Sequence, residues 1–213
     1  ANYILQYCTE LQSDCFGLSR NKPPIRIGIP PMLSTVFFPE LLTAFQKEYP
    51  DVPVMLEEYA SVRACNLVQN DSLDLALVNM EQYNIDKFHH ALLANDQVVF
   101  CVSKEHPLVR KEEATIQDMA QIPLIFFNGD SVQNQLLKIR FELEGFTPHV
   151  LMHNSQIYTT LQFLKNNNCG CFLYSSMTDK FPDIVQLPLK PPLFIKIGMI
   201  WKKGKYISND MQT

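Results

Sequence analysis

The chain is poor in glycine, in basic charge and in long apolar stretches. Its seven glycines leave little material for a phosphate-cradling loop, and it has no P-loop, G-x-G-x-x-G or G-x-S-x-G motif. With 18 Lys and Arg against 22 Asp and Glu, these residues should not hold DNA by phosphate neutralisation alone. No run of about 18 apolar residues occurs, so no membrane-spanning helix is expected.

Apolar residues are plentiful, at 46% of 213 positions. This favours one large domain or two small ones, each with its own core, over disorder. Most of the six cysteines lie in apolar runs, and we interpret them as reduced core residues of a cytosolic protein. They are Cys8, Cys15, Cys65, Cys101, Cys169 and Cys171. The last two could form a redox pair, but a buried strand is favoured.

The first 22 residues carry a helical pattern. Apolar residues recur in steps of four and three at Ile4, Cys8, Leu11, Cys15 and Leu18. This spacing predicts a helix that packs its seam against a partner, with an ordinary amphipathic helix as the alternative. The helix should end before the Pro23-Pro24 linker, because proline lacks a donor and holds its predecessor extended.

Beyond the linker, two series of strands and helices alternate. The first series has strands at 25–29, 52–58 and 73–78 and helices at 37–49 and 62–68. The second has strands at 96–103, 123–127, 149–152 and 170–174, helices at 116–120, 132–144 and 157–165, and closing strands at 184–187 and 193–201. This order predicts an α/β fold of two Rossmann-like lobes around a cleft. Lobe I would comprise residues 23–99 and 194–213, and lobe II residues 100–193.

Candidate catalytic groups are few. His149 and His153 would lie about 13 Å apart along a strand, too far to share a metal. We expect the carboxylates of Glu57, Glu58, Asp71 and Asp74 to be solvated or to form turns. We therefore expect no enzymatic activity, no metal and no cofactor.

Polar side chains, mostly hydroxyls and amides, gather where strands lead into helices. They are Ser34, Thr35, Ser61, Asn128, Ser131, His153, Asn154 and Ser155, with Gly129 and Asp130 in the third turn. Capping of the helices is one explanation. Alternatively, several helix N-termini meet at the cleft and bind an anion or polar ligand through free N–H groups. Ligands of open α/β sheets sit beyond the carboxyl ends of the strands, which favours a small-molecule receptor.

Two long segments resemble a known family. IRIGIPPMLSTVFFPELLTAFQKEYPDVPVMLEE, followed by LDLALV, resembles the start of the effector-binding domain of LysR-type transcriptional regulators. VVFCVSKEHPLVRKEEATIQDMAQIPLIFF resembles the crossover into that domain's second lobe. The resemblance covers roughly residues 24 to 200, and residues 1–22 would then be the end of the family's linker helix.

The resemblance implies a fold similar to type 2 periplasmic binding proteins and a role as the sensor half of a cytoplasmic regulator. The partners implied are a small-molecule effector and a second subunit, as a homodimer that becomes a tetramer in the full-length protein. The helices at 37–49 and 132–144 would face that subunit, unless they only cover their own sheets. Promoter DNA would be bound only through a winged helix-turn-helix domain preceding the linker helix, which this chain lacks, and no membrane contact is expected.

The family's ligand contacts carry over to four turns of this chain. The corresponding residues are Pro31, Met32, Ser34, Thr35, Ser61, Val62, Asn128, Ser131, His153 and Asn154. One departure is Asn70-Asp71, where the family has glycine before the L-D-L-A strand. Asn and Asp tolerate left-handed backbone conformations, so the turn should survive. A periplasmic solute-binding protein for transport is the alternative function, because it would share the two lobes.

Overall fold

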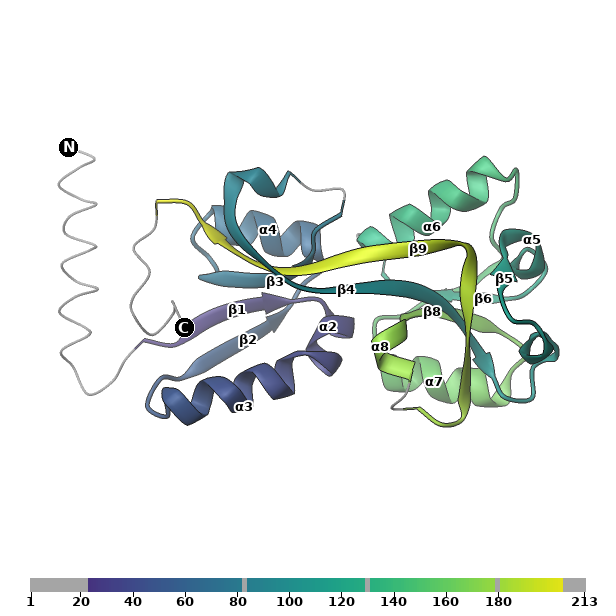
Figure 1. Cartoon of the computed structure of the whole chain (residues 1–213), viewed down its shortest axis with the longest axis horizontal. Helices are drawn as coiled ribbons and strands as arrows, with labels where there is room; N and C mark the ends of the chain where they lie inside the picture. Colours follow the sequence, from purple (N-terminus) through teal and green to yellow (C-terminus); the bar gives the residue numbers. More distant parts are fainter. Residues whose placement is uncertain (1–22, 82–83, 129–130, 179–180, 205–213) are drawn as a thin grey trace.

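The computed structural model describes residues 23–81, 84–128, 131–178 and 181–204. Two α/β lobes lie side by side and are joined by two long strands, which run from one lobe to the other (Figure 1). This confirms the predicted two-lobed α/β fold. The expected linker helix at residues 1–22 lies outside the described residues.

Lobe I is built on a parallel sheet in which β1 pairs with both β2 and β3. Its elements are β1 (Ile25–Ile29), α2 (Pro31–Val36), α3 (Phe38–Glu48), β2 (Val54–Glu58), α4 (Ser61–Gln69) and β3 (Leu75–Asn79). All five residues of β3 are buried, as expected for a central strand covered on both faces. Helices α3 and α4 lie on opposite sides of the sheet (Figure 1).

The helix predicted at 37–49 is α3 in the structure, and a short helix that the sequence did not predict, α2, precedes it. Helix α2 ends at Val36, and α3 begins at Phe38 with Pro39 in its first turn. Proline is favoured there because the first N–H groups of a helix have no intrahelical acceptor. Ser34 and Thr35 therefore lie inside α2 and not in the turn before it.

Lobe II repeats the pattern, with β6 parallel to both β7 and β8. Its elements are η2 (Pro107–Arg110), β5 (Ala114–Thr115), α5 (Ile116–Met119), β6 (Leu124–Phe126), α6 (Val132–Leu143), β7 (Val150–His153), α7 (Ile157–Asn166), β8 (Gly170–Tyr174) and α8 (Ser175–Thr178). Helices α6 and α7 flank this sheet on opposite sides (Figure 1). Both lobes are thus three-layered, which accounts for the apolar strands recognised in the sequence.

The two long strands are β4 (Phe88–Ser103), preceded by the short turn η1 (Ile85–Lys87), and β9 (Ile184–Lys202). They pair antiparallel along almost their whole length. The path through the sheet is β2-β1-β3-β9-β4-β8-β6-β7, with β5 attached to β9. Each long strand therefore contributes one half to each lobe.

The prediction of two separate closing strands, at 184–187 and 193–201, was wrong. Both segments belong to β9, although Pro188, Pro191 and Pro192 interrupt the apolar pattern. The register against β4 shifts between Val98 and Val99, whose partners are Leu193 and Pro188. Residues 189–192 leave the β4 ladder at this shift, and Leu189 and Lys190 pair with β5 instead. A bulge of this kind accommodates prolines that a regular central strand would exclude.

The turn before β3 survives without glycine, as predicted. Asp71 has φ of +60°, a left-handed conformation that Asp tolerates better than most residues. Asp74 has more than a turn-forming role. Its carboxylate accepts hydrogen bonds from the backbone N–H of Arg26 at 2.9 Å and from Nε and Nη2 of the same residue. This contact ties the start of β3 to β1.

Four of the six cysteines lie in the described chain, and all four are buried with free thiols. They are Cys65, Cys101, Cys169 and Cys171. Cys101 in β4 stands opposite Cys171 in β8. Hydrogen bonding with Cys101 and burial raise the pKa of the Cys171 thiol well above its ordinary value, so both belong to the core of lobe II. Cys8 and Cys15 lie outside the described residues.

Candidate functional site

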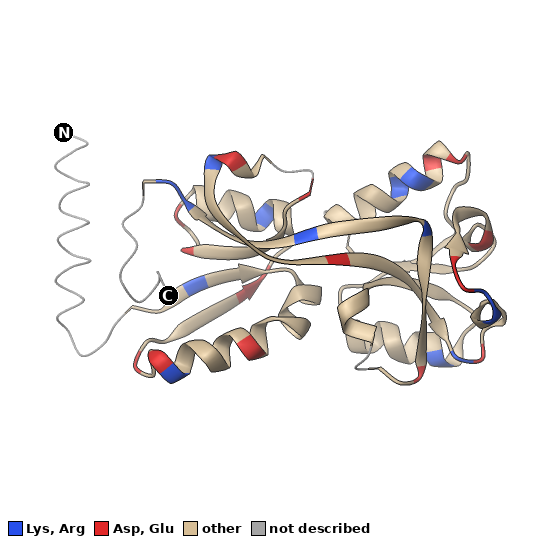
Figure 2. Ribbon diagram, in the orientation of Figure 1, with Lys and Arg blue, Asp and Glu red and all other residues tan. Residues whose placement is uncertain are grey.

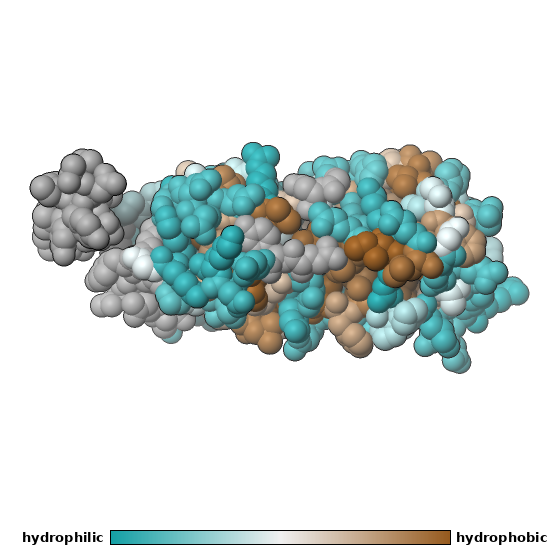
Figure 3. All heavy atoms as spheres, turned by 90° about the horizontal axis from the view of Figure 1, so that it is seen from above, coloured by the Kyte–Doolittle hydropathy of each residue, from teal (hydrophilic) through white to brown (hydrophobic). Residues whose placement is uncertain are grey.

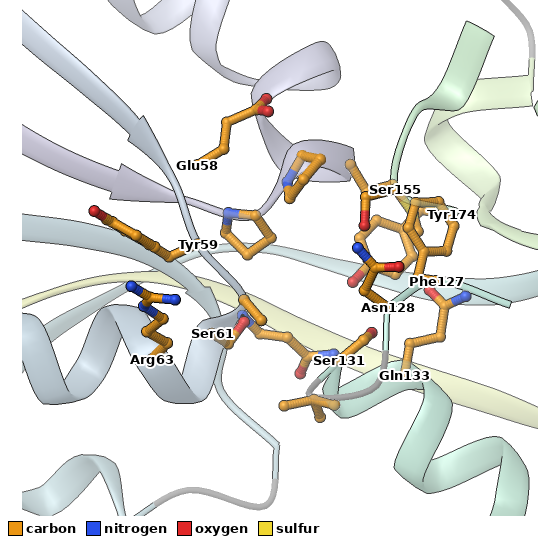
Figure 4. Close-up of a pocket in the computed structure, with 16 residues that line it drawn as sticks. Glu58, Tyr59, Ser61, Arg63, Phe127, Asn128, Ser131, Gln133, Ser155 and Tyr174 are labelled. Carbon is orange, nitrogen blue, oxygen red and sulfur yellow. The ribbon is translucent and has the colours of Figure 1, made fainter. Parts of the chain in front are cut away.

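A pocket of about 320 Å³ lies between the two lobes, beyond the carboxyl ends of their parallel strands. Lobe I supplies the turn from β1 into α2, the segment from β2 into α4, and the end of β3. Lobe II supplies the segment from β6 into α6, Ser155 before α7, and the end of β8. Figure 4 shows side chains from both lobes converging on this space. It is the position at which open α/β sheets bind ligands.

Five of the ten residues predicted as ligand contacts line this pocket: Pro31, Met32, Ser61, Asn128 and Ser131. The other five are Ser34, Thr35, Val62, His153 and Asn154, and they lie outside its lining. Each turn identified from the sequence contributes to the pocket, although the fourth does so through Ser155. The turns were therefore placed better than the individual side chains.

Ser34 and Thr35 bond within their own helix. The hydroxyls of both residues donate to the carbonyl oxygen of Pro31, at 2.8 and 3.1 Å. Ser34 also lies 2.7 Å from Oε1 of Glu58, which is part of the pocket lining. Ser34 thus lies outside the pocket lining and holds the carboxylate of Glu58 in place.

His153 and Asn154 shape the lobe II wall in a similar way. Nδ1 of His153 lies 3.0 Å from the carbonyl oxygen of Phe127. The Asn154 side chain accepts from the Gln156 N–H at 3.1 Å and donates to Oγ1 of Thr160 at 3.1 Å. These bonds fix the turn from which Ser155 reaches the pocket. Val62 follows Ser61 in α4 and is half-buried.

Charged and aromatic residues that sequence reasoning passed over form the lobe I wall. The Arg63 guanidinium lies 4.8 Å from the centre of the Tyr59 ring, a distance at which the ring attracts a cation. Tyr59 donates its hydroxyl to Glu57, and this bond is the main cause that raises the pKa of the tyrosine. In Figure 4, Tyr59, Ser61 and Arg63 lie on one side of the pocket, opposite Phe127, Gln133 and Tyr174.

The remaining polar lining residues include three deeply buried side chains: Asn79, Gln133 and Tyr174. We call them the floor of the pocket. Gln133 donates through Nε2 to the carbonyl oxygen of Phe172 at 3.0 Å. Burial raises the pKa of Tyr174 well above its ordinary value, and the neighbouring Asn79 amide partly offsets the rise. The tyrosine is therefore a neutral hydroxyl at any physiological pH.

One sequence signal could have found Gln133. It precedes Leu137 by four residues and Phe141 by eight, and both are buried on α6. Residues at this spacing share one face of a helix. A polar residue on an otherwise apolar face is a candidate for a buried function. Asn79, by contrast, only marks the end of an apolar strand and gave no comparable signal.

The helices that start at the pocket lack side-chain caps. Among the described residues, the N-cap residues of α2, α4, α6 and α7 make no side-chain capping hydrogen bond. Helix α5, which does not border the pocket, has a complete capping box between Thr115 and Asp118. Capping therefore does not explain the hydroxyl and amide side chains at the pocket. The first N–H groups of a helix have no intrahelical acceptor, and together with the positive ends of the helix dipoles they suit an anionic or polar ligand.

Both lobes carry residues of both charge signs (Figure 2). Across residues 23–81, 84–128, 131–178 and 181–204, no three His, Cys, Asp or Glu side chains gather as they would around a metal ion. None of the helices in those ranges combines the length and apolar character that a bilayer crossing requires.

Comparison with known proteins gives concordant matches. Residues 19–213 match the family model described as LysR substrate binding domain. The uncharacterized HTH-type transcriptional regulator YwbI of Bacillus subtilis is 29% identical over 88% of this chain and 63% of its own length. The transcriptional dual regulator GltC of the same organism is 22% identical over 90% of this chain and 65% of its own length. The chain thus spans less than two thirds of these relatives.

Solved structures share the fold. The C-terminal domain of a probable LysR family regulator from Rhodococcus sp. RHA1 has a TM-score of 0.75 at 21% identity, over 89% of this chain and 95% of that one. The effector binding domain of QuiR in complex with shikimate has a TM-score of 0.73 at 19% identity, over 89% and 92%.

Proposed function

Because the chain belongs to the LysR substrate-binding domain family, we propose that it is the sensor of a transcriptional regulator and binds a small anionic metabolite between its lobes. The observation that carries this proposal is the meeting of uncapped helix N-termini from both lobes at one pocket. Backbone N–H groups at a helix start bind carboxylate or phosphate groups without a lysine. Arg63 adds a positive charge on the lobe I side.

The proposed contacts are the five predicted residues that line the pocket, together with Tyr59, Arg63 and the floor residues Asn79, Gln133 and Tyr174. Ser34, His153 and Asn154 act one layer further out, by holding lining residues in place. Thr35 and Val62 lie in α2 and α4, the helices that carry the contacts Pro31, Met32, Ser61 and Arg63. The carboxylate of the ligand lies at the start of α4, because Arg63 and the first N–H groups of that helix belong to its first turn and Arg63 lines the pocket.

The ligand regulates by binding one arrangement of the lobes better than another. A tenfold preference for one arrangement corresponds to about 1.4 kcal/mol. The lobes meet through β4 and β9, and we place the boundary at the shift between Val98 and Val99. Residues 23–99 and 194–213 then form lobe I, and residues 100–193 form lobe II.

The partners follow from the regulator role. The domain pairs with a second copy, as a homodimer within a tetramer of the full-length protein. Support comes from α3, which has no fully buried residue, and from α6, where Leu143 is 81% exposed. DNA is bound by a separate winged helix-turn-helix domain, and the protein acts in the cytoplasm, where its promoter lies. No catalytic step is part of this role.

The test is a thermal-shift screen of small carboxylates, amino acids and inorganic anions, with native mass spectrometry of the purified chain. The proposal expects a dimer that is stabilised by at least one acid and binds one molecule per chain. A monomer that binds a nutrient with the same stoichiometry would favour the transport protein. A chain that no anion stabilises would contradict the anionic ligand.

A further inference from the structure

Glu58 is the last residue of β2 and the one carboxylate among the described lining residues of the pocket. The residue is exposed, so a ligand can reach it. Its Oε1 lies 2.7 Å from Oγ of Ser34, and the same Oγ lies 2.8 Å from the carbonyl oxygen of Pro31. A hydroxyl has one proton to share between these two acceptors, whereas an ionised carboxylate can accept about four hydrogen bonds. The carboxylate of Glu58 therefore keeps room for further donors.

Arg63 is the one basic side chain among the described lining residues, and it is exposed as well. Its guanidinium lies over the ring of Tyr59. The ion pairs between described residues involve neither Glu58 nor Arg63. Uncharged groups thus hold both side chains in place, and the pocket presents one charge of each sign.

These two charges limit the ligands that the pocket accepts. A sphere with the volume of the pocket is about 8.5 Å across, and charges closer than about 8 Å are only partly screened at physiological salt. A ligand that is only an anion is therefore attracted by Arg63 and repelled by Glu58 at the same time. A ligand hydroxyl could donate to Glu58 but would leave this repulsion in place. An ammonium group on the ligand turns the repulsion into attraction and supplies the missing donors.

We propose that the ligand is an amino acid, whose ammonium group binds Glu58 while its carboxylate binds at the start of α4. This inference rests on the proposed function, because that carboxylate is the anionic group assigned there. Glu58, Tyr59 and Arg63 lie on the lobe I side of the pocket (Figure 4), so both charged groups of the ligand face lobe I. The rest of the ligand faces the lobe II lining, which includes Phe127. Ser34 is a positioning residue for Glu58.

The test compares acids in matched pairs that differ only in an amino group: leucine and 4-methylpentanoate, glutamate and glutarate, 4-aminobutyrate and butyrate. Their dissociation constants are measured at neutral pH by isothermal titration calorimetry. Hydrogen bonds between charged groups are strong, so we expect at least about a tenfold preference for the amino member of a pair that binds. The preference should vanish in Glu58→Gln, which keeps an acceptor for Ser34. It should persist in Glu112→Gln, a matched change at an exposed position outside the pocket lining.

The outcomes separate this inference from the proposed function. Equal or weaker binding of the amino member in every pair that binds would overturn the ammonium site and leave the anion sensor standing. A preference that survives in Glu58→Gln would overturn the assignment to Glu58. No binding by any of the six acids would count against both proposals. If Glu58→Gln fails to fold, the comparison of the paired acids on the wild-type chain still decides, because it involves no substitution.

Discussion

The hydroxyl oxygen of Ser61 accepts a hydrogen bond from the backbone N–H of Asn79 at 3.0 Å. This bond joins the first residue of α4 to the last residue of β3, and both residues are buried. The oxygen of Ser61 is therefore engaged within lobe I and does not cap its own helix. In the proposed site the first N–H groups of α4 bind the ligand, and the serine holds the helix start against the end of β3.

Removing this contact should destabilise lobe I. In Ser61→Ala, the buried N–H of Asn79 loses its acceptor, which costs about 1–3 kcal/mol in the free energy of unfolding. Urea denaturation measures the change. Ser72→Ala, at an exposed position, is the control and should stay within about 0.5 kcal/mol of wild type. Equal stability of the two variants would show that the Ser61 contact is unimportant.

The contact between Arg26 and Asp74 should matter more than the surface ion pairs. Asp74→Ala removes three hydrogen bonds to Arg26, and we expect a loss of about 1–2 kcal/mol, since the arginine is partly exposed. Lys104→Ala breaks an exposed pair with Asp183 and should cost less than about 1 kcal/mol. Denaturation curves for both variants compare the losses in the free energy of unfolding. A larger loss in Lys104→Ala than in Asp74→Ala would contradict this prediction.

Stability should fall as the solution becomes acidic, and His106 should contribute to the fall. Burial lowers the pKa of this histidine, and its Nδ1 accepts the N–H of Leu108 at 3.2 Å. The unfolded chain then binds a proton more readily than the folded chain, so the free energy of unfolding decreases as the pH falls below about 6.5.

A non-titrating variant isolates this effect. His106→Asn keeps an acceptor for Leu108 but cannot be protonated. Between about pH 7.5 and about pH 5.5 its stability should drop less than that of the wild type. Thermal unfolding at several pH values measures how stability changes with pH in the wild type and in the variant. The same pH dependence in both would mean that other groups cause the acid sensitivity.

The four described cysteines should resist alkylation in the folded chain. Burial raises the pKa of Cys65 to about 12, so almost no reactive thiolate forms at about pH 8. Iodoacetamide should modify Cys65, Cys101, Cys169 and Cys171 only after denaturation, as peptide mass spectrometry would detect. Rapid modification of Cys101 or Cys171 in the folded protein would argue that lobe II opens readily.

The fold was predictable because its strands are apolar and its helices periodic. The buried strands β3 and β8 and the helices α4, α6 and α7 lie within a few residues of their predicted positions. Strand β9 was not predicted as one continuous strand, because three prolines interrupt its apolar pattern. Only its pairing with β4 and β5 shows how the prolines are accommodated. Such tertiary pairing leaves no local trace in the sequence.

The site was predictable at the level of turns and not of side chains. Strand ends indicated where the pocket lies, but the direction of each side chain depends on packing. Ser34 turns toward Glu58, while Arg63, two residues after Ser61 in α4, reaches the pocket.

The exposed apolar surface could not be predicted from the sequence either. In Figure 3 the most hydrophobic patch of the visible face lies over the lobe II half.

The most direct test of the account is the affinity of the pocket for a carboxylate in the presence and absence of Arg63. Isothermal titration calorimetry would compare the wild type, Arg63→Gln and the exposed control Arg110→Gln, using the acid that gives the largest thermal shift. Loss of a charge-assisted bond of about 1.5–3 kcal/mol predicts binding at least about tenfold weaker in Arg63→Gln. The control should match the wild type. Unchanged affinity in Arg63→Gln would contradict the anion site at the start of α4.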